Sequence, residues 1–275
     1  MRNISILLFV LVFYAEGVLV AQEISKMKLF LLIGQSNMAG RGKIEMQDTV
    51  FYPGVLSLNK DLKWIPACDP IHFDKKEAGV GLCRTFGIEM QKYYHRIDSL
   101  DCFSVGLIPC AVGGTDIDKW QPGGYDANTN THPWEDMVKR VNYAKQNGEI
   151  AGILWLQGEG DSNRDKSKLY KDKLLNLITR VRLLGGNKNT PFLCGELGRF
   201  FVKKQMKEGK SDAAQVIKTT KKIMQKGTNT AFVSSKGLTD RGDKLHFDAK
   251  SCRELGHRYA IEYQNLMKHA LQNKN

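Results

Sequence analysis

The sequence lacks three features that would point to common classes of protein. Its six cysteines show no C-x-x-C spacing, so a structural zinc site is not expected. Beyond residue 21, no apolar run is long enough to cross a bilayer. Internal repeats, linkers and low-complexity segments are also missing, which favours one domain over residues 22–275.

Acidic residues are in the minority. The chain has 29 Asp and Glu against 41 Lys and Arg, which gives a formal net charge of +12. A basic balance of this size raises the question of a nucleic-acid partner. The basic residues are spread along helix-like segments with no recognition motif, so we expect no nucleic-acid partner. We expect most of this charge to be solvated, and a weak attraction to acidic polysaccharide is the alternative.

The N-terminal segment is typical of a secretory signal peptide over residues 1–21. Arg2 precedes an apolar stretch from Ile4 to Phe13, and small residues follow near Ala21. The stretch is short for a membrane span, and an uncleaved anchor is the alternative. Cleavage would leave a secreted or periplasmic protein without a membrane segment.

Export would place the cysteines in an oxidising compartment, where disulfides form. The sequence does not give their pairing. Cys110 and Cys194 lie in strand-like runs and can equally be small buried core residues.

Short apolar runs alternate with helix-like segments along the chain. Continuous apolar runs of this length are typical of strands buried on both faces. The alternation predicts a three-layer α/β sandwich with a mostly parallel central sheet and helices on both faces. The predicted strands begin near residues 28, 103, 149, 190 and 230, and the predicted helices span 81–97, 134–146, 167–186, 211–227 and 251–272.

The region from Lys43 to Gly79 breaks this rhythm. It is rich in Asp, Pro and Lys and shows no clear periodicity. Long irregular segments in compact domains tend to be functional. We therefore expect this region to shape the rim of a site.

The carboxyl ends of parallel strands form the edge at which ligands bind. Ser36 lies two residues beyond the first apolar run, in the stretch "LFLLIGQSNMAGRG". A serine on a strand-to-helix turn is well placed for nucleophilic attack. A helix N-cap or a simple turn is the alternative.

Two further strand ends carry groups that can donate hydrogen bonds. Gly113 and Gly114 follow the run "FSVGLIPC", and paired glycines let backbone amides approach a substrate closely. Gln157 and Glu159 follow "GILWL", where a side-chain amide can stabilise developing negative charge. An ordinary turn and the start of a solvated loop are the respective alternatives.

Asp243 and His246 precede the last predicted helix. At a spacing of three residues, the carboxylate can reach the imidazole, fix its tautomer and leave the other nitrogen facing the serine. A surface turn or a pair of metal ligands is the alternative. Neither explains why three other strand ends carry matching parts, so we interpret the set as a nucleophile, a base with its orienting carboxylate, and amide donors.

Four segments of the chain, "GQSNMAGRG", "PCAVGGTDI", "WLQGEGDS" and "DKLHFD", resemble the motif blocks of the SGNH-hydrolase superfamily. The resemblance is to its carbohydrate esterase family six and sialate O-acetylesterase branch, and it covers nearly the whole chain after Lys28. It implies a flavodoxin-like fold. Gly160 departs from the family pattern, and residues 198–212 form an extension where substrate preference can differ.

The resemblance also implies roles for individual residues. It makes Ser36 the nucleophile and His246 the general base, oriented by Asp243. The oxyanion would be held by the Ser36 amide, the Gly113 amide and the Gln157 side chain. Glu159 is expected to support the Gln157 loop. No metal or other cofactor is implied.

Three functions are compatible with these residues. The first is a secreted serine esterase that removes acetyl groups from a glycan such as acetylated xylan. The second is a sialate O-acetylesterase or a short-chain lipid esterase. The third is a glycan-binding protein on an inactive esterase fold, which the intact set of residues disfavours. Aromatic residues near the motifs suit stacking on sugars, although ordinary packing is the alternative: Trp64, Trp120, Tyr125 and Trp134.

Overall fold

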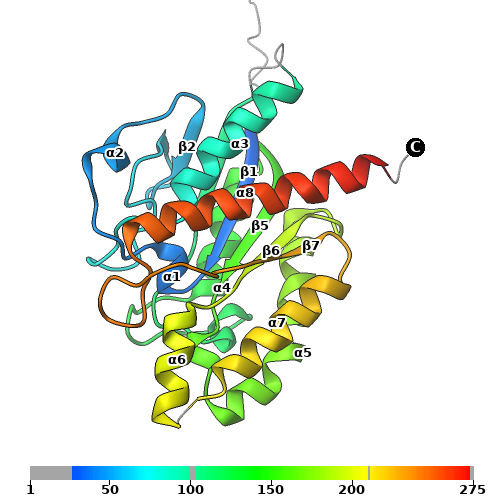
Figure 1. The fold of residues 1–275 in the computed structure, drawn as a ribbon. Coiled ribbons are helices and arrows are strands. Elements are labelled where there is room, and N and C mark those ends of the chain that lie inside the picture. The colour runs from blue at the N-terminus through cyan, green and yellow to red at the C-terminus, as the bar shows by residue number, and fades with distance from the viewer. Residues whose placement is uncertain (1–26, 99–102, 210, 273–275) are drawn as a thin grey trace, which may run out of the picture.

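A seven-stranded sheet organises the computed structural model, which describes residues 27–98, 103–209 and 211–272 (Figure 1). β3 pairs antiparallel with β2, and every other neighbouring pair is parallel. The strands in spatial order are β3 (Trp64–Pro66), β2 (Val55–Leu58), β4 (Val105–Pro109), β1 (Met27–Gly34), β5 (Gly148–Leu156), β6 (Phe192–Gly195) and β7 (Thr230–Val233).

Helices cover both faces of this sheet. One face packs against α3 (Cys83–Ile97) and α8 (Ala249–Gln272), and the other against α4 (Pro133–Ala144), α5 (Arg164–Gly185) and α7 (Ala213–Lys226) (Figure 1). Shorter elements complete the fold: α1 (Ser36–Ala39), α2 (Met46–Thr49), α6 (Arg199–Glu208) and the 3₁₀ turns η1 (Ile117–Trp120) and η2 (Glu159–Asp161).

The central strand β1 contributes to both halves of the core. Phe30 points toward α3 and α8, where its ring packs edge-on against Phe86 and Tyr263. On the opposite face, the neighbouring strand β5 sends Trp155 against Trp120. A strand buried on both sides in this way has a continuous apolar run, which is the signal that the sequence carries.

The predicted fold class is confirmed. All five predicted strands form, as β1, β4, β5, β6 and β7, and the five predicted helices form as α3, α4, α5, α7 and α8. The prediction missed α2, β2 and β3, which lie between Lys43 and Gly79. These elements have three or four residues each, too few to show periodicity, and β3 is an edge strand that contains Pro66. The extension over residues 198–212 contains α6.

Five cysteines lie in the described residues, and all five are free thiols: Cys68, Cys83, Cys110, Cys194 and Cys252. Cys194 is buried in the core, and Cys110 is partly buried and packs against the same cluster of core residues. Cys102 and the predicted signal peptide lie outside the described residues. Within the described ranges, no helix has both the length and the apolar character of a membrane span.

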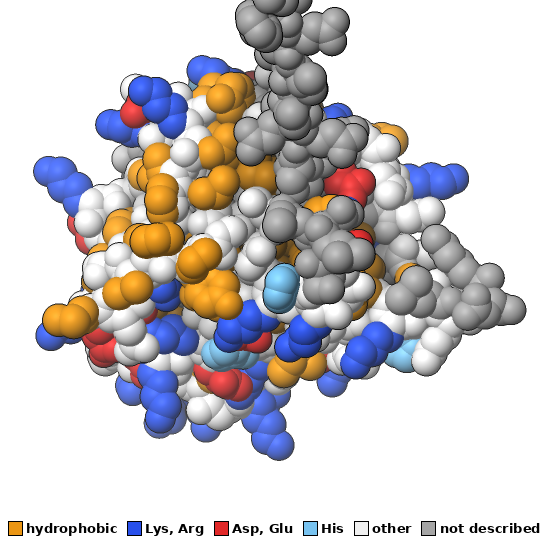
Figure 2. Space-filling model, turned by 90° about the horizontal axis from the view of Figure 1, so that it is seen from above, with side chains coloured by type: hydrophobic (Ala, Val, Ile, Leu, Met, Phe, Trp, Pro, Cys, Tyr) orange, Lys and Arg blue, Asp and Glu red, His pale blue; other side chains and the backbone are white. Residues whose placement is uncertain are grey.

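Figure 2 shows the face seen from above Figure 1. Lys and Arg side chains are spread around this face, whereas hydrophobic side chains gather over part of it. A spread of this kind is typical of solvated surface charge.

Candidate active site

Ser36 owes its position to a close approach of two strands. Gly34 ends β1 at φ +137°, and a Cβ at that position would lie 2.2 Å from the carbonyl oxygen of Leu156 in β5. Any other residue would push the strands apart. The chain turns there, the Gln35 N–H donates to Leu156 at 3.0 Å, and Ser36 opens α1 with 6% of its surface exposed.

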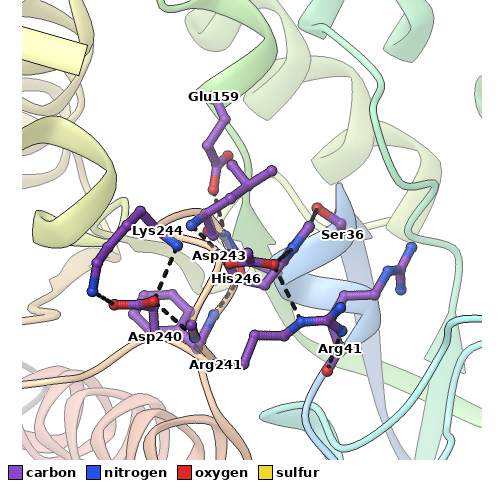
Figure 3. Close-up of polar contacts among 12 residues, drawn as sticks. Ser36, Arg41, Glu159, Asp240, Arg241, Asp243, Lys244 and His246 are labelled. Carbon is purple, nitrogen blue, oxygen red and sulfur yellow. Dashed lines mark hydrogen bonds and ion pairs between the residues drawn. The ribbon is translucent and has the colours of Figure 1, made fainter. Parts of the chain in front are cut away.

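The His246 imidazole reaches Ser36 from the loop between β7 and α8 (Figure 3). Its Nε2 lies 3.0 Å from Ser36 Oγ, and its Nδ1 lies 2.7 Å from Asp243 Oδ2. Asp243 Oδ1 accepts the N–H groups of Leu245 and His246, at 2.9 and 2.8 Å, which fixes the loop. These contacts bring the three predicted residues together in the predicted order.

The electrostatics of this pair suit a neutral imidazole beside an ionised carboxylate. Burial would raise the pKa of Asp243, but the hydrogen bonds from His246 and Leu245 lower it to about 2. Burial lowers the pKa of His246, against the raising effect of Asp243, and the charges of Arg41 and Arg241 lower it further. A neutral imidazole hydrogen-bonded to a hydroxyl can take its proton.

The Gly113 amide lies beside Ser36, as predicted, but its N–H already donates a hydrogen bond to a carboxylate. Gly113 N–H donates to Asp74 Oδ2 at 2.8 Å. The same oxygen accepts from Arg41 Nη2 at 2.7 Å, in a pair whose side chains are 5% and 1% exposed. By contrast, the Ser36 N–H has no hydrogen-bond acceptor among the described residues.

The predicted role of Gln157 needs correction. Its side chain is 1% exposed, and its amide nitrogen donates to the Thr115 carbonyl at 3.1 Å and to Asp161 Oδ2 at 2.6 Å. The Tyr170 hydroxyl donates to its amide oxygen at 3.2 Å. Both N–H groups are therefore engaged inside the protein, and Gln157 holds the loop after β5 instead of facing Ser36.

Glu159 supports a different loop from the one we predicted. Its Oε1 accepts from Asn37 Nδ2 at 2.6 Å, and the same nitrogen donates to the Leu245 carbonyl at 3.1 Å. The Phe247 N–H donates to Asn37 Oδ1 at 3.1 Å. Glu159 thus acts through Asn37 on the loop that carries His246.

The residues that we did not predict differ in how clearly the sequence marks them. Asn37 and Arg41 lie inside the stretch around Ser36, where only their position next to a nucleophile marks them. Asp74 lies in the irregular region predicted to form the rim, but nothing in that region shows which carboxylate points inward.

No group of three or more His, Cys, Asp or Glu side chains suited to a metal ion occurs in the part of the chain that the structure describes.

The family model described as carbohydrate esterase, sialic acid-specific acetylesterase, matches residues 26–265. The chain belongs to this family. Membership of this family indicates an esterase and supports the removal of acetyl groups from carbohydrates. The assignment to carbohydrate esterase family six within the branch remains a prediction.

Several relatives of this carbohydrate esterase are known. A probable carbohydrate esterase of Arabidopsis thaliana, At4g34215, is 30% identical over 255 residues, covering 86% of this chain and 90% of the relative. Its X-ray structure superposes with a TM-score of 0.73 at 28% identity, covering 87% of this chain and 98% of that one.

Two more distant structures share the fold. NanS matches with a TM-score of 0.68 at 15% identity, covering 89% of this chain and 98% of that one. XAC1771, a carbohydrate acetylesterase from Xanthomonas citri, matches at 0.63 and 18% identity, covering 87% of this chain and 56% of that one.

The corrected role of Gln157 predicts that Gln157→Ala acts mainly on stability. Loss of its buried hydrogen bonds leaves the Thr115 carbonyl without a side-chain donor and Asp161 with the Ile117 N–H alone, which should lower the free energy of unfolding by about 1–3 kcal/mol. Well below the unfolding midpoint, the esterase kcat should stay within about tenfold of wild type. Urea unfolding and hydrolysis of p-nitrophenyl acetate measure the two effects, with exposed Gln215→Ala as the control. A loss of about 10²–10³ in kcat would restore Gln157 as an oxyanion donor.

Proposed function

We propose that the protein is a secreted serine esterase that removes O-acetyl groups from a carbohydrate through an acyl-enzyme on Ser36. The observation that carries the proposal is the chain of contacts from Asp243 through His246 to Ser36, with distances of 2.7 and 3.0 Å. Nucleophile, base and orienting group in this order can cleave esters.

In the first step, Ser36 Oγ attacks the acetyl carbonyl carbon. His246 Nε2 takes the hydroxyl proton, and the carbonyl electron pair moves to the oxygen, which becomes the oxyanion. The intermediate collapses when the sugar oxygen leaves with the proton from His246. Water, deprotonated by His246, then attacks the acetyl carbon. The bond from this carbon to Ser36 Oγ breaks, His246 returns the proton to Oγ, and acetate is released.

Two of the three predicted oxyanion donors remain, the N–H groups of Ser36 and Gly113, and they differ in their present partners. The Ser36 N–H has no acceptor among the residues that the structure describes, so it is ready for a substrate oxygen. The Gly113 N–H is held by Asp74 and serves only after this carboxylate moves.

The surroundings of the site favour a sugar over a fatty chain. A cavity of about 270 Å³ adjoins Asp74, with Phe73, Thr129 and Arg140 in its lining. Arg140 lies over the half-exposed Phe73 ring, 4.8 Å from its centroid, and the hydroxyl and charged groups of the lining suit a polar ligand. Among the predicted stacking residues, Trp120 is fully buried against Trp155 and packs in the core, whereas Tyr125 is 43% exposed.

Acetylated xylan is our preferred substrate class, because the sequence resembles the acetylxylan esterase-like branch. A sialate O-acetylesterase is the second candidate, which the description of the matching family favours. We expect release of acetate from acetylated xylan to exceed release from O-acetylated sialic acid, measured side by side, and the opposite order would favour the second candidate.

Ser36→Ala should abolish the proposed reaction. The variant keeps the fold, since it removes one oxygen, but it should lower the hydrolysis of p-nitrophenyl acetate by at least about 10³-fold. Circular dichroism checks that the variant is folded. Equal slow hydrolysis by wild type and variant would favour a glycan-binding protein without catalysis.

The activity should persist to lower pH than the ordinary pKa of histidine would allow. The base must be neutral, and burial lowers the pKa of His246, so the acid limb of kcat/KM should have its midpoint below about 6.5. Asp243→Asn removes a group that raises this pKa, so the limb should move to still lower pH while the rate falls by up to about 10⁴. An acid limb well above pH 7 would contradict this account of His246.

A further inference from the structure

Two donors converge on one anionic oxygen in the candidate active site. Asp74 Oδ2 accepts from the Gly113 N–H at 2.8 Å and from Arg41 Nη2 at 2.7 Å. A second, longer bond of 3.4 Å joins Arg41 Nη1 to Asp74 Oδ1. Distances of this kind from two fixed donors to one negatively charged oxygen are what an oxyanion hole provides.

This oxygen is held close to Ser36. A Cβ built on Gly113 would lie 2.4 Å from Arg41 Nη2, 2.9 Å from Asp74 Oδ2 and 3.4 Å from Ser36 Cβ. A side chain at position 113 would enter the space between these three groups, so a larger residue would displace Arg41 or Asp74. The charge of Arg41 also acts on His246, which places it within the same electrostatic environment.

We propose that Arg41 is a catalytic residue, whose guanidinium binds the oxyanion together with the Gly113 N–H. In the substrate-free enzyme Asp74 occupies the oxyanion position, and the acetyl carbonyl oxygen displaces it. The inference rests on the proposed function of Ser36. Arg41 would then be the side-chain donor to the oxyanion, in place of Gln157.

The interaction between Arg41 and the substrate carbonyl oxygen is strongest when that oxygen becomes negatively charged. The acetyl carbonyl is neutral in the ground state and its oxygen becomes anionic in the tetrahedral intermediate, so a fixed guanidinium stabilises the transition state more than the bound ester. The planar, always charged guanidinium is already oriented toward an anionic oxygen, because Asp74 holds it there.

The Asp74 side chain can move into the cavity that adjoins it. A carboxylate removed from its partner cannot stay buried without compensation. Asp74 also lines the cavity of about 270 Å³, and the same lining contains Lys60, Lys139 and Arg140, against a single further carboxylate at Asp136. A rotation of the Asp74 side chain into this cavity keeps its charge beside cationic groups.

Three variants test whether Arg41 is a donor to the oxyanion or only the ion-pair partner of Asp74. Arg41→Met should lower kcat for p-nitrophenyl acetate by about 10²–10³-fold with a smaller change in KM. Because this change leaves Asp74 buried and unpaired, the double variant Arg41→Met/Asp74→Asn provides the same test without the unpaired charge. We expect the double variant to stay as slow as Arg41→Met. Asp74→Asn alone weakens the internal competitor and should raise kcat/KM several-fold.

Recovery of the wild-type kcat in the double variant would overturn the proposal, because Arg41 would then serve only to neutralise Asp74. The matched control is Arg253→Met/Asp48→Asn, which removes another ion pair with a buried carboxylate. It should lower the unfolding temperature and leave kcat within about threefold of wild type. Failure of the proposed function itself is recognised separately, since Ser36→Ala would then match wild type.

A structure of the wild-type adduct tests the geometry without any variant. Diethyl p-nitrophenyl phosphate reacts with an activated serine: Oγ bonds to phosphorus and p-nitrophenolate leaves. We expect the phosphoryl oxygen within hydrogen-bond distance of Arg41 Nη2 and Gly113 N, with Asp74 turned away. An adduct in which Asp74 still accepts from both donors would contradict the proposal.

Discussion

The arrangement of the site depends on the side chain of Asn37. Its amide accepts from Phe247, donates to the Leu245 carbonyl and donates to Glu159. These bonds tie the turn after β1, which carries Ser36, to the loop after β5 and to the loop before α8. One further bond, from Arg241 Nη1 to the Arg41 carbonyl at 2.9 Å, joins the His246 loop to the segment that follows Ser36. Asn37 therefore positions the base, His246, as well as the turn that carries the nucleophile, Ser36.

Several charged groups around this centre are held at a cost in stability. Burial raises the pKa of Glu159, and its Oε2 has no hydrogen-bond partner among the described residues. Burial also raises the pKa of Asp161 to about 6, even though Gln157 and Ile117 donate to it. Groups of this kind gather where a protein fixes a chemical site. Arg41 and Asp74 add a buried ion pair beside the same centre.

The sequence was informative wherever one residue type can satisfy a physical requirement. Strands buried on both faces require continuous apolar runs, so β1 and β5 were predictable, as was the turn at Gly34, where a side chain would collide with Leu156. Asp243 and His246 were predictable because their contact is local in the chain. The partners of Gln157 were not, since an amide beyond a strand can face either the substrate or the protein interior. Asp74 gave no signal at all, because its contacts with Arg41 and Gly113 arise only in the folded chain.

The central claim is that the described residues converge on Ser36 Oγ and make it carry the acetyl group during turnover. Rapid quenching with acid during hydrolysis of p-nitrophenyl acetate, followed by mass spectrometry of peptides, measures this directly. We predict one acetyl group, on the peptide that contains Ser36, which forms within the first turnover and disappears as acetate is released. Steady release of acetate with no acetylated peptide, or with the acetyl group on another residue, would contradict the account.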